Sequence, residues 1–314
     1  MPEELLIADI PPTSAGMRLD QALAELFPDF SRSKLQSWIR SGHARIDGLT
    51  LTPKHKVMGG EQVELLAEID LETECQAEDI PLEIIYEDES ILIVNKPAGL
   101  VVHPAAGHRG GTLQNALLHH APELAGIPRS GIVHRIDKDT SGVLMVAKTL
   151  RAHKSLVEQL QARSIHREYL ALVQGYLTAG GTVDAPIGRH PTDRKRFAVR
   201  EGGRDSVTHY RVEERFSAHT LLRVKLETGR THQIRVHMTH IHHPLLGDPV
   251  YGGRLKVPAG GDESLAAVLR AFHRQALHAQ VLGLEHPRTG EWCQWQVDLA
   301  EDMASLLDAL RRAA

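Results

Sequence analysis

The stretch "GIVHRIDKDTSGVLMVAK", residues 131–148, places two aspartates, Asp137 and Asp139, between two apolar runs. Apolar runs of this length are typical of strands, so the stretch predicts a strand, a loop and a strand. The Thr-Ser-Gly after Asp139 favours a turn. Asp137 would lie at a strand end that opens into a cleft, where a carboxylate suits a nucleophile or a general base. An ordinary loop residue, or one half of a metal-binding Asp-x-Asp pair, fits the spacing equally.

The composition of the 314-residue chain, 42% apolar and 24% charged, is typical of a globular protein of one large or two smaller domains. No apolar run approaches the roughly 20 residues of a membrane-spanning helix. The N-terminus "MPEELLIADIPP" lacks the basic start and apolar centre of a secretory signal. Cys75 and Cys293 are too few for a disulfide framework. We therefore expect a cytoplasmic protein that has no membrane partner.

The charge of the chain is unevenly distributed. Residues 61–90 hold twelve Asp or Glu and no Lys or Arg, so a net charge of −4 leaves +8 for the remainder. A local basic field, and not the total charge, attracts phosphate. The segment 189–204 is either such a field or a solvated loop. Its basic residues are Arg189, Arg194, Lys195, Arg196, Arg200 and Arg204.

The acidic segment "DLETECQAEDIP", residues 70–81, indicates a linker because it has weak periodicity, high charge and a closing proline. We therefore predict an N-terminal domain over 1–76 with its core at 17–66, the end of an acidic linker at 77–81, and a larger domain over 82–314.

The N-terminal domain shows the pattern of two helices followed by strands. Leu19 and Leu23 recur at helical spacing, and Ser31 opens a second helix. A short strand, a turn at Asp47-Gly48 and the strand "GGEQVELL" follow.

The second of these helices carries three basic residues, Arg32, Lys34 and Arg40. A helix N-terminus with basic and hydroxyl side chains suits phosphate. A capped surface helix is the alternative.

The larger domain has strand-like segments that do not alternate regularly with helices. Two strands in "LEIIYEDESILIVNK" precede the helix "GGTLQNALLHH" and the strand "EYLALVQGYL", and "DMASLLDALRRA" ends the chain as a helix. This order predicts an α+β fold with a mixed, largely antiparallel sheet, not a doubly wound one.

The segment "TGRTHQIRVHM" contains Arg235 and several histidines. As a strand over 230–238, it would place Arg235 on one face, where it needs a carboxylate if buried; an exposed Arg235 is the alternative. His232 and His237 would then lie on opposite faces, which disfavours a metal site. No Walker, GxGxxG, HExxH, CxxC or GxSxG motif occurs, so we expect neither a cofactor nor a metal.

The segment "RLDQALAELFPDFSRSKLQSWIRSGHARIDG" resembles the S4 RNA-binding domain. This resemblance implies that the N-terminal domain binds structured RNA through the second helix.

Four further segments resemble the RluA family of pseudouridine synthases, and with the N-terminal S4-like domain this resemblance covers essentially the whole chain. They are "ILIVNKPAGLVVHP", "GIVHRIDKDTSGVLMVAK", "REYLALVQG" and "LETGRTHQIRVHMTHIHHPLLGDPVYGG". Ile136 and Val143 stand where that family usually has leucine. The resemblance implies the pseudouridine synthase fold and the isomerisation of uridine to pseudouridine without a cofactor.

By this resemblance, Asp137 is the catalytic aspartate, Arg235 pairs with it and keeps it ionised, and Tyr169 stacks on the target base. Arg135 would fill the space that the extruded base leaves, and Thr140 would shape the loop. His134 belongs with these substrate-binding candidates.

The segments "VDAPIGRHPTDRKRFAV" and "GDPVYGGRLKVPAGG" are most similar to subgroup D of that family. The resemblance implies a monomer that modifies uridines in an inter-subunit-bridge stem-loop of 23S ribosomal RNA, as free RNA or in a large-subunit precursor particle. Three alternatives remain open: other 23S ribosomal RNA sites or tRNA as substrate, a non-catalytic assembly factor, and a metal-dependent nucleotide or glycosyl enzyme.

Overall fold

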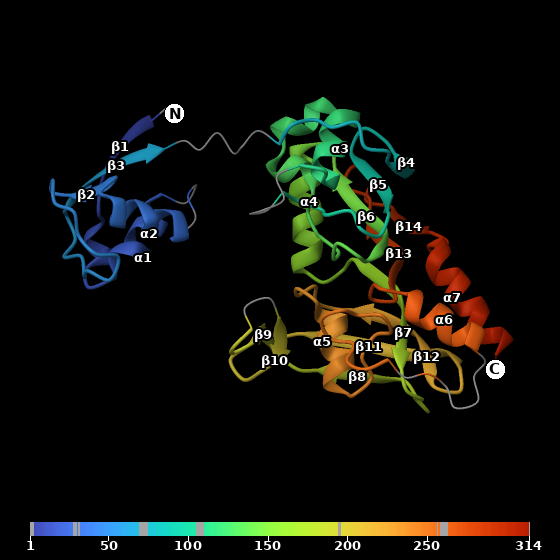
Figure 1. Ribbon diagram of the computed structural model, residues 1–314. Coiled ribbons are helices and arrows are strands. Elements are labelled where there is room, and N and C mark those ends of the chain that lie inside the picture. Colours follow the sequence, from blue (N-terminus) through green and yellow to red (C-terminus); the bar gives the residue numbers. More distant parts are fainter. Residues whose placement is uncertain are drawn as a thin grey trace. The chain divides into compact units, whose positions relative to one another are not determined.

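The computed structural model describes residues 3–27, 30, 32–68, 75–104, 110–193, 196–255, 257 and 263–313. The chain divides into two compact units, Met1–Glu74 and Cys75–Ala314 (Figure 1). No helix within the described residues is long and apolar enough to cross a membrane.

The N-terminal unit combines two helices with an antiparallel sheet of strand order β1-β3-β2. Its elements are β1 (Glu3–Asp9), η1 (Pro12–Ser14), α1 (Leu19–Leu26), α2 (Arg32–Ser41), β2 (Ala44–Ile46) and β3 (Gln62–Glu68). Both expected helices and both expected strands are confirmed, and Ser31 lies outside the described residues. Asp47 and Gly48 have φ of 48° and 75°, as a tight two-residue turn requires. Strand β1, which pairs with β3, was not predicted from the sequence.

The second unit is built on a nine-stranded sheet of order β4-β5-β6-β13-β7-β12-β11-β8, with β14 paired to β13. Among the described strands of this sheet only β6 and β13 pair in parallel, so the expected mixed, largely antiparallel sheet is confirmed. The strands are β4 (Glu83–Glu87), β5 (Ile91–Lys96), β6 (Ser141–Ala147), β7 (His166–Gln174), β8 (Gly181–Asp184), β11 (Val207–Arg215), β12 (His219–Leu226), β13 (Leu277–Glu285) and β14 (Trp292–Gln296). A separate pair is formed by β9 (Ile187–Arg189) and β10 (Phe197–Val199).

Helices cover this sheet in separate groups (Figure 1). They are α3 (Leu113–His120), α4 (Leu150–Gln161), α5 (Gln233–His240), α6 (Glu263–Ala271) and α7 (Glu301–Arg312), with the short turns η2 (Pro122–Gly126) and η3 (Pro128–Gly131). Residues of α3 and α4 share one hydrophobic core with β5 and β6, and residues of α6 and α7 share another with β7 and β12.

Strand β6 crosses the middle of the sheet, and all its residues are buried. At its start, Gly142 has a φ of 113°, and a Cβ there would lie 2.1 Å from the carbonyl oxygen of Ala279 on β13. Only glycine lets the two backbones approach so closely. This close approach fixes where the loop that precedes β6 ends.

The expected strand over 230–238 is wrong, because residues 233–240 form helix α5. Ile234 and Met238, four residues apart, enter the large core together, as a helix requires. The apolar residues at 234, 236 and 238 also fit the two-residue period of a strand, so the pattern was ambiguous. The prediction that His232 and His237 lie on opposite faces of a strand is therefore wrong as well.

The strand expected before Asp137 is also absent. From residue 132 to 140 the chain is irregular, apart from one isolated bridge between Ile132 and Val146. Asp137 therefore lies in a loop that leads into β6, not at the end of a strand.

Candidate active site

The Asp137 loop is a tight turn held by neighbouring segments. The Thr140 amide donates to the Asp137 carbonyl at 3.0 Å, and residues 138 and 139 form the turn, so the turn expected at Asp139 is confirmed. Gln275 donates to the buried Thr140 hydroxyl at 3.1 Å. Arg274 donates to the Asp139 carbonyl at 3.1 Å.

Lys96, which ends β5, holds the same loop from its other side. Its fully buried ammonium donates to the carbonyls of Pro97, Leu100 and Lys138 at 2.7, 2.9 and 2.9 Å. Burial lowers the pKa of Lys96 to about 7, although the negative charge of Asp139 opposes this shift. Three carbonyl acceptors need three N–H donors, which only the charged form supplies. Sequence reasoning missed this residue as part of the site.

Helix α5 brings Arg235 to Asp137. Arg235 is 5% exposed, and its Nη1 lies 2.9 Å from Asp137 Oδ2. Its Nε and Nη2 donate to Asp248 at 2.7 and 2.9 Å, in a two-bonded, fork-like geometry. Burial opposes the charge on Arg235, but the two carboxylates outweigh burial and raise its pKa further.

Asp248 is a second carboxylate that sequence reasoning missed. Its side chain is fully buried, and the amides of Val250 and Tyr251 donate to its Oδ1 at 2.8 and 3.0 Å. Burial raises the pKa of Asp248, but Arg235 and these amides outweigh burial and lower it overall. The only advance signal was the need of a buried arginine for acid partners.

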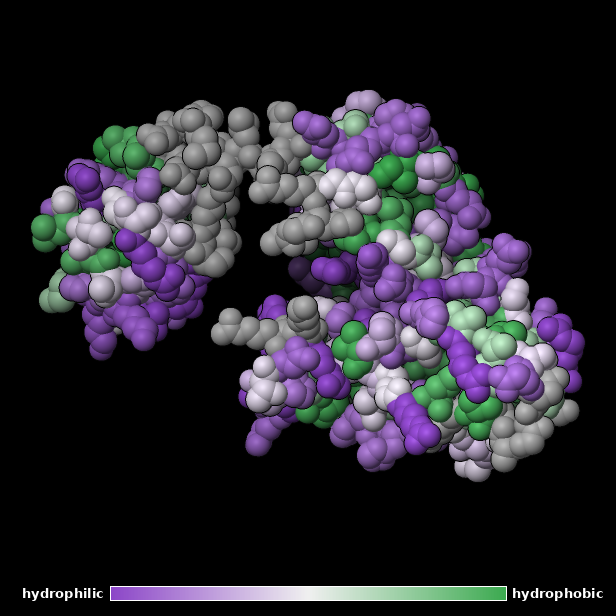
Figure 2. Space-filling model, viewed as in Figure 1, coloured by the Kyte–Doolittle hydropathy of each residue, from purple (hydrophilic) through white to green (hydrophobic). Residues whose placement is uncertain are grey.

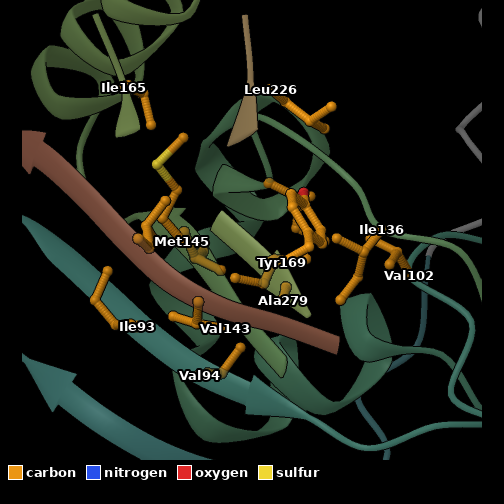
Figure 3. Packing of buried hydrophobic residues seen from close by; sticks show 14 of the residues in the cluster. Ile93, Val94, Val102, Ile136, Val143, Met145, Ile165, Tyr169, Leu226 and Ala279 are labelled. Atoms are coloured by element: carbon orange, nitrogen blue, oxygen red, sulfur yellow. The ribbon is translucent and has the colours of Figure 1, made fainter. Parts of the chain in front are cut away.

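Tyr169 lies on β7 with 7% of its surface exposed. Figure 3 shows its ring beside Ile136, the residue directly before Asp137. Burial raises the pKa of the Tyr169 phenol; the negative charge of Asp137 adds to this effect, and the positive charge of Arg167 opposes it.

His232 precedes α5 with a φ of 58°, in the left-handed region. Its Nδ1 lies 2.9 Å from the Tyr251 hydroxyl, and its Nε2 lies 3.9 Å from Asp137 Oδ1. Burial lowers the pKa of His232, although Asp137 opposes this effect. His237 instead contacts Thr208 and the Ala185 carbonyl. The described residues contain no group of three or more potential metal ligands.

The remaining substrate-binding candidates lie on both sides of the loop. The side chain of Arg135 is exposed. His134 faces inward, where its Nε2 accepts from the Met145 amide at 3.1 Å. Burial and, to a smaller extent, the positive charge of Arg167 together lower the pKa of His134 to about 3.

The predicted RNA-binding residues differ in their exposure and in their ion pairs. In the N-terminal unit, Arg32 pairs with the buried Asp20 at 2.8 Å and Arg40 is exposed. Arg194 and Lys195 lie outside the described residues, and the Lys34 side chain is not described either.

Around β9 and β10, aromatic rings support the basic residues. Arg189 lies 5.4 Å from the centre of the Phe197 ring, and Arg196 lies 5.3 Å from that of Tyr251. Figure 2 shows mainly hydrophilic residues on the visible surface of this region.

Comparison with known proteins places these features in a family. Residues 90–240 match the model "RNA pseudouridylate synthase", and residues 17–63 match the S4 domain. Proteins named ribosomal large subunit pseudouridine synthase D are similar along nearly the whole chain. The one from Xanthomonas campestris pv. campestris is 56% identical, over 97% of this chain and 92% of its own. The one from Pseudomonas aeruginosa is 57% identical, over 97% and 95%.

Solved structures agree on the fold. Human RNA pseudouridylate synthase domain containing 1 superposes with a TM-score of 0.54 at 25% identity, covering 75% of this chain and 96% of the human chain. Human RNA pseudouridylate synthase domain containing 4 gives 0.58 at 24% identity, over 73% and 93%. The chain therefore belongs to the RNA pseudouridylate synthase family and carries an S4 domain in front of the synthase region.

Proposed function

We propose that this protein converts uridines to pseudouridine in 23S ribosomal RNA, within the stem-loop that forms an inter-subunit bridge. The observation that carries this proposal is the sequence identity of 56% and 57% to proteins named ribosomal large subunit pseudouridine synthase D, which extends over both units of the chain. Similarity confined to the synthase region would support the reaction but not the choice of RNA.

Asp137 starts the reaction. Its carboxylate is 17% exposed, so a substrate can reach it, and Arg235 holds it from the buried side at 2.9 Å. Because Arg235 is itself fixed by two bonds to Asp248, the position of the Asp137 carboxylate is set before RNA binds. Such preorganisation removes the cost of orienting the catalyst. During the reaction the N1–C1′ bond breaks, the uracil turns, a C5–C1′ bond forms, and a proton leaves C5 while N1 gains one.

The target base leaves its stack to reach Asp137. Extrusion costs a few kcal/mol and is cheapest in a loop whose bases are already unstacked. Tyr169 stacks on the extruded base, and the exposed Arg135 enters the space that it leaves. Thr140 holds the shape of the turn through its bond to Gln275, and His134 supports the loop from inside.

Two basic regions supply affinity for the RNA backbone: the second helix of the S4 domain and the segment around β9 and β10. Contacts of this kind release counterions, so binding weakens as salt rises. We also propose that residues 1–76 and 82–314 act as the RNA-binding and catalytic domains, and that the protein works as a monomer in the cytoplasm on ribosomal RNA or a large-subunit precursor particle.

A matched pair of aspartate variants tests the assignment. In cells that lack this gene, pseudouridine mapping of total RNA identifies the lost positions. Wild type and Asp139→Asn are expected to restore them, and Asp137→Asn to restore none while its purified form still binds the RNA. Restoration by Asp137→Asn would refute the catalytic assignment, and loss of positions only in tRNA would refute the choice of RNA.

A further inference from the structure

Arg167 is a buried cation next to the site that the reaction described above does not use. It lies on β7 two residues before Tyr169, so both side chains point to the same face of the sheet. His166 and Glu168 point to the other face, where they contact each other at 3.1 Å. Alternation along the strand thus separates Arg167 from the carboxylate that is nearest in sequence.

The guanidinium of Arg167 has unused hydrogen-bonding capacity. Arg167 is 7% exposed, and its buried Nε has no acceptor among the residues that the structure describes. Its Nη2 makes one long bond, 3.4 Å, to the Glu227 carbonyl. The Glu227 carboxylate is engaged with His209 at 2.6 Å. An arginine is rarely buried without a carboxylate partner, because the desolvated charge is costly.

The position of Arg167 relates it to the reacting groups. Its positive charge lowers the pKa of Tyr169, whereas the negative charge of Asp137 raises it. It also acts on His134, which lies in the Asp137 loop. Gly229 makes room for it, since a Cβ at that position would lie 2.7 Å from Arg167 Nη1.

We propose that Arg167 donates hydrogen bonds to the uracil once it is detached and stabilises its negative charge. This inference rests on the proposed function. When the N1–C1′ bond breaks, its electron pair goes to uracil N1 and spreads over the carbonyl oxygens. The charge is consumed when C5 bonds to C1′, a proton leaves C5 and N1 gains one. A preorganised donor in a water-poor site is well suited to such transient charge. Arg235 is not free for this task, because both ends of its guanidinium hold carboxylates.

The first test compares Arg167→Met, Arg167→Lys and the exposed control Arg163→Met, using the full-length protein and a ribosomal RNA fragment. The single-turnover rate of Arg167→Met is expected to fall about 100-fold, the order seen when one such donor is removed. Its Kd for RNA and its Tm are expected to stay at wild-type level or improve, because no ion pair is lost. Arg167→Lys is expected to recover part of the rate, and Arg163→Met to keep all of it.

Two outcomes would overturn the proposal. An unchanged rate of Arg167→Met with weaker RNA binding identifies a phosphate contact, and an unchanged rate with a lower Tm identifies a structural role.

The second test changes the leaving group. Fluorine at C5 stabilises the uracil anion, so breakage of the N1–C1′ bond in 5-fluorouridine RNA depends less on an external cation. Because C5 of this substrate carries no proton to lose, the rate that is compared is that of N1–C1′ cleavage, and the deficit of Arg167→Met in this rate is expected to be several-fold smaller than on uridine RNA. An equal deficit on both substrates overturns the proposal. Gly229→Ala, which displaces the guanidinium, is expected to slow the wild type but not Arg167→Met. If wild type forms no pseudouridine at all, the proposed function itself is wrong.

Discussion

The buried Asp248–Arg235 pair predicts that Asp248→Asn destabilises the catalytic unit strongly. Asp248 Oδ1 accepts three bonds, from Arg235 Nη2 and from the amides of Val250 and Tyr251, while Oδ2 accepts only from Arg235 Nε. An asparagine that keeps the three bonds through its oxygen places its NH₂ group against Arg235 Nε. Two donors then face each other, and the Arg235 cation has lost one of its two carboxylate partners.

The expected magnitude follows from burial. Removing one partner of a buried pair costs about 3–5 kcal/mol, and the Asp248 side chain is fully buried. In a unit of this size, about 2–4 °C of Tm is lost per kcal/mol. Asp248→Asn should therefore lower Tm by roughly 6–20 °C. Because Arg235 loses the carboxylate that fixes its position beside Asp137, we also expect the rate of pseudouridine formation to fall at least tenfold.

The chain offers a control of the same geometry. Arg274 binds Asp302 through Nε and Nη2 at 2.6 Å each, but the Asp302 side chain is 49% exposed. Arg274 is buried, but the Asp302 end of the pair is open to water, which can take the place of the lost carboxylate, so Asp302→Asn should cost clearly less than Asp248→Asn. Thermal and urea unfolding measure both variants.

A double-mutant cycle completes the test. Arg235→Met leaves the Asp248 carboxylate buried and unpaired, so that change alone is expected to cost about 3–5 kcal/mol. The double variant with Asp248→Asn should cost clearly less than the sum of the two changes. Equal effects of Asp248→Asn and Asp302→Asn, or a strictly additive cycle, would refute the view that burial makes this pair strong.

Three further predictions concern the surroundings of the site. Lys96→Met should destabilise by about 3 kcal/mol, because three hydrogen bonds from its buried ammonium are lost, whereas the exposed Lys154→Met should change little; urea unfolding measures both. His134, whose pKa falls from 6.5 to about 3 on folding, contributes stability that is fully present above about pH 6.5 and is lost as pH falls toward 3. Unfolding free energy should fall by about 2 kcal/mol between pH 7 and 4.5, and this loss should be smaller in His134→Asn but not in His119→Gln. Gly142→Ala should cost about 3 kcal/mol or more through overlap with β13, while Gly126→Ala, which has no neighbour within 4 Å, should leave Tm unchanged.

Local patterns predicted much of the fold. Helical spacing indicated α1 and α7, and alternating or continuous apolar runs indicated β5, β6 and β7, because these periods reflect which side chains face a core. Turn chemistry located the bends at Asp47-Gly48 and at Asp139. Where the apolar pattern fitted two periods, as over 230–238, the sequence could not choose, and packing of Ile234 and Met238 into the large core decided for a helix.

The sequence by itself determined the candidate residues of the site and the need of Arg235 for an acid. Only the tertiary structure decided how that need is met, since Asp137 and Asp248 reach Arg235 from opposite directions along the chain, 98 residues before it and 13 residues after it. The same holds for Lys96, whose role depends on the Lys138 carbonyl 42 residues away. It holds also for Arg167, because its surroundings decide that its Nε has no acceptor among the described residues. Residue type and period are local, but the satisfaction of buried charges and hydrogen bonds depends on which distant segments the fold brings together.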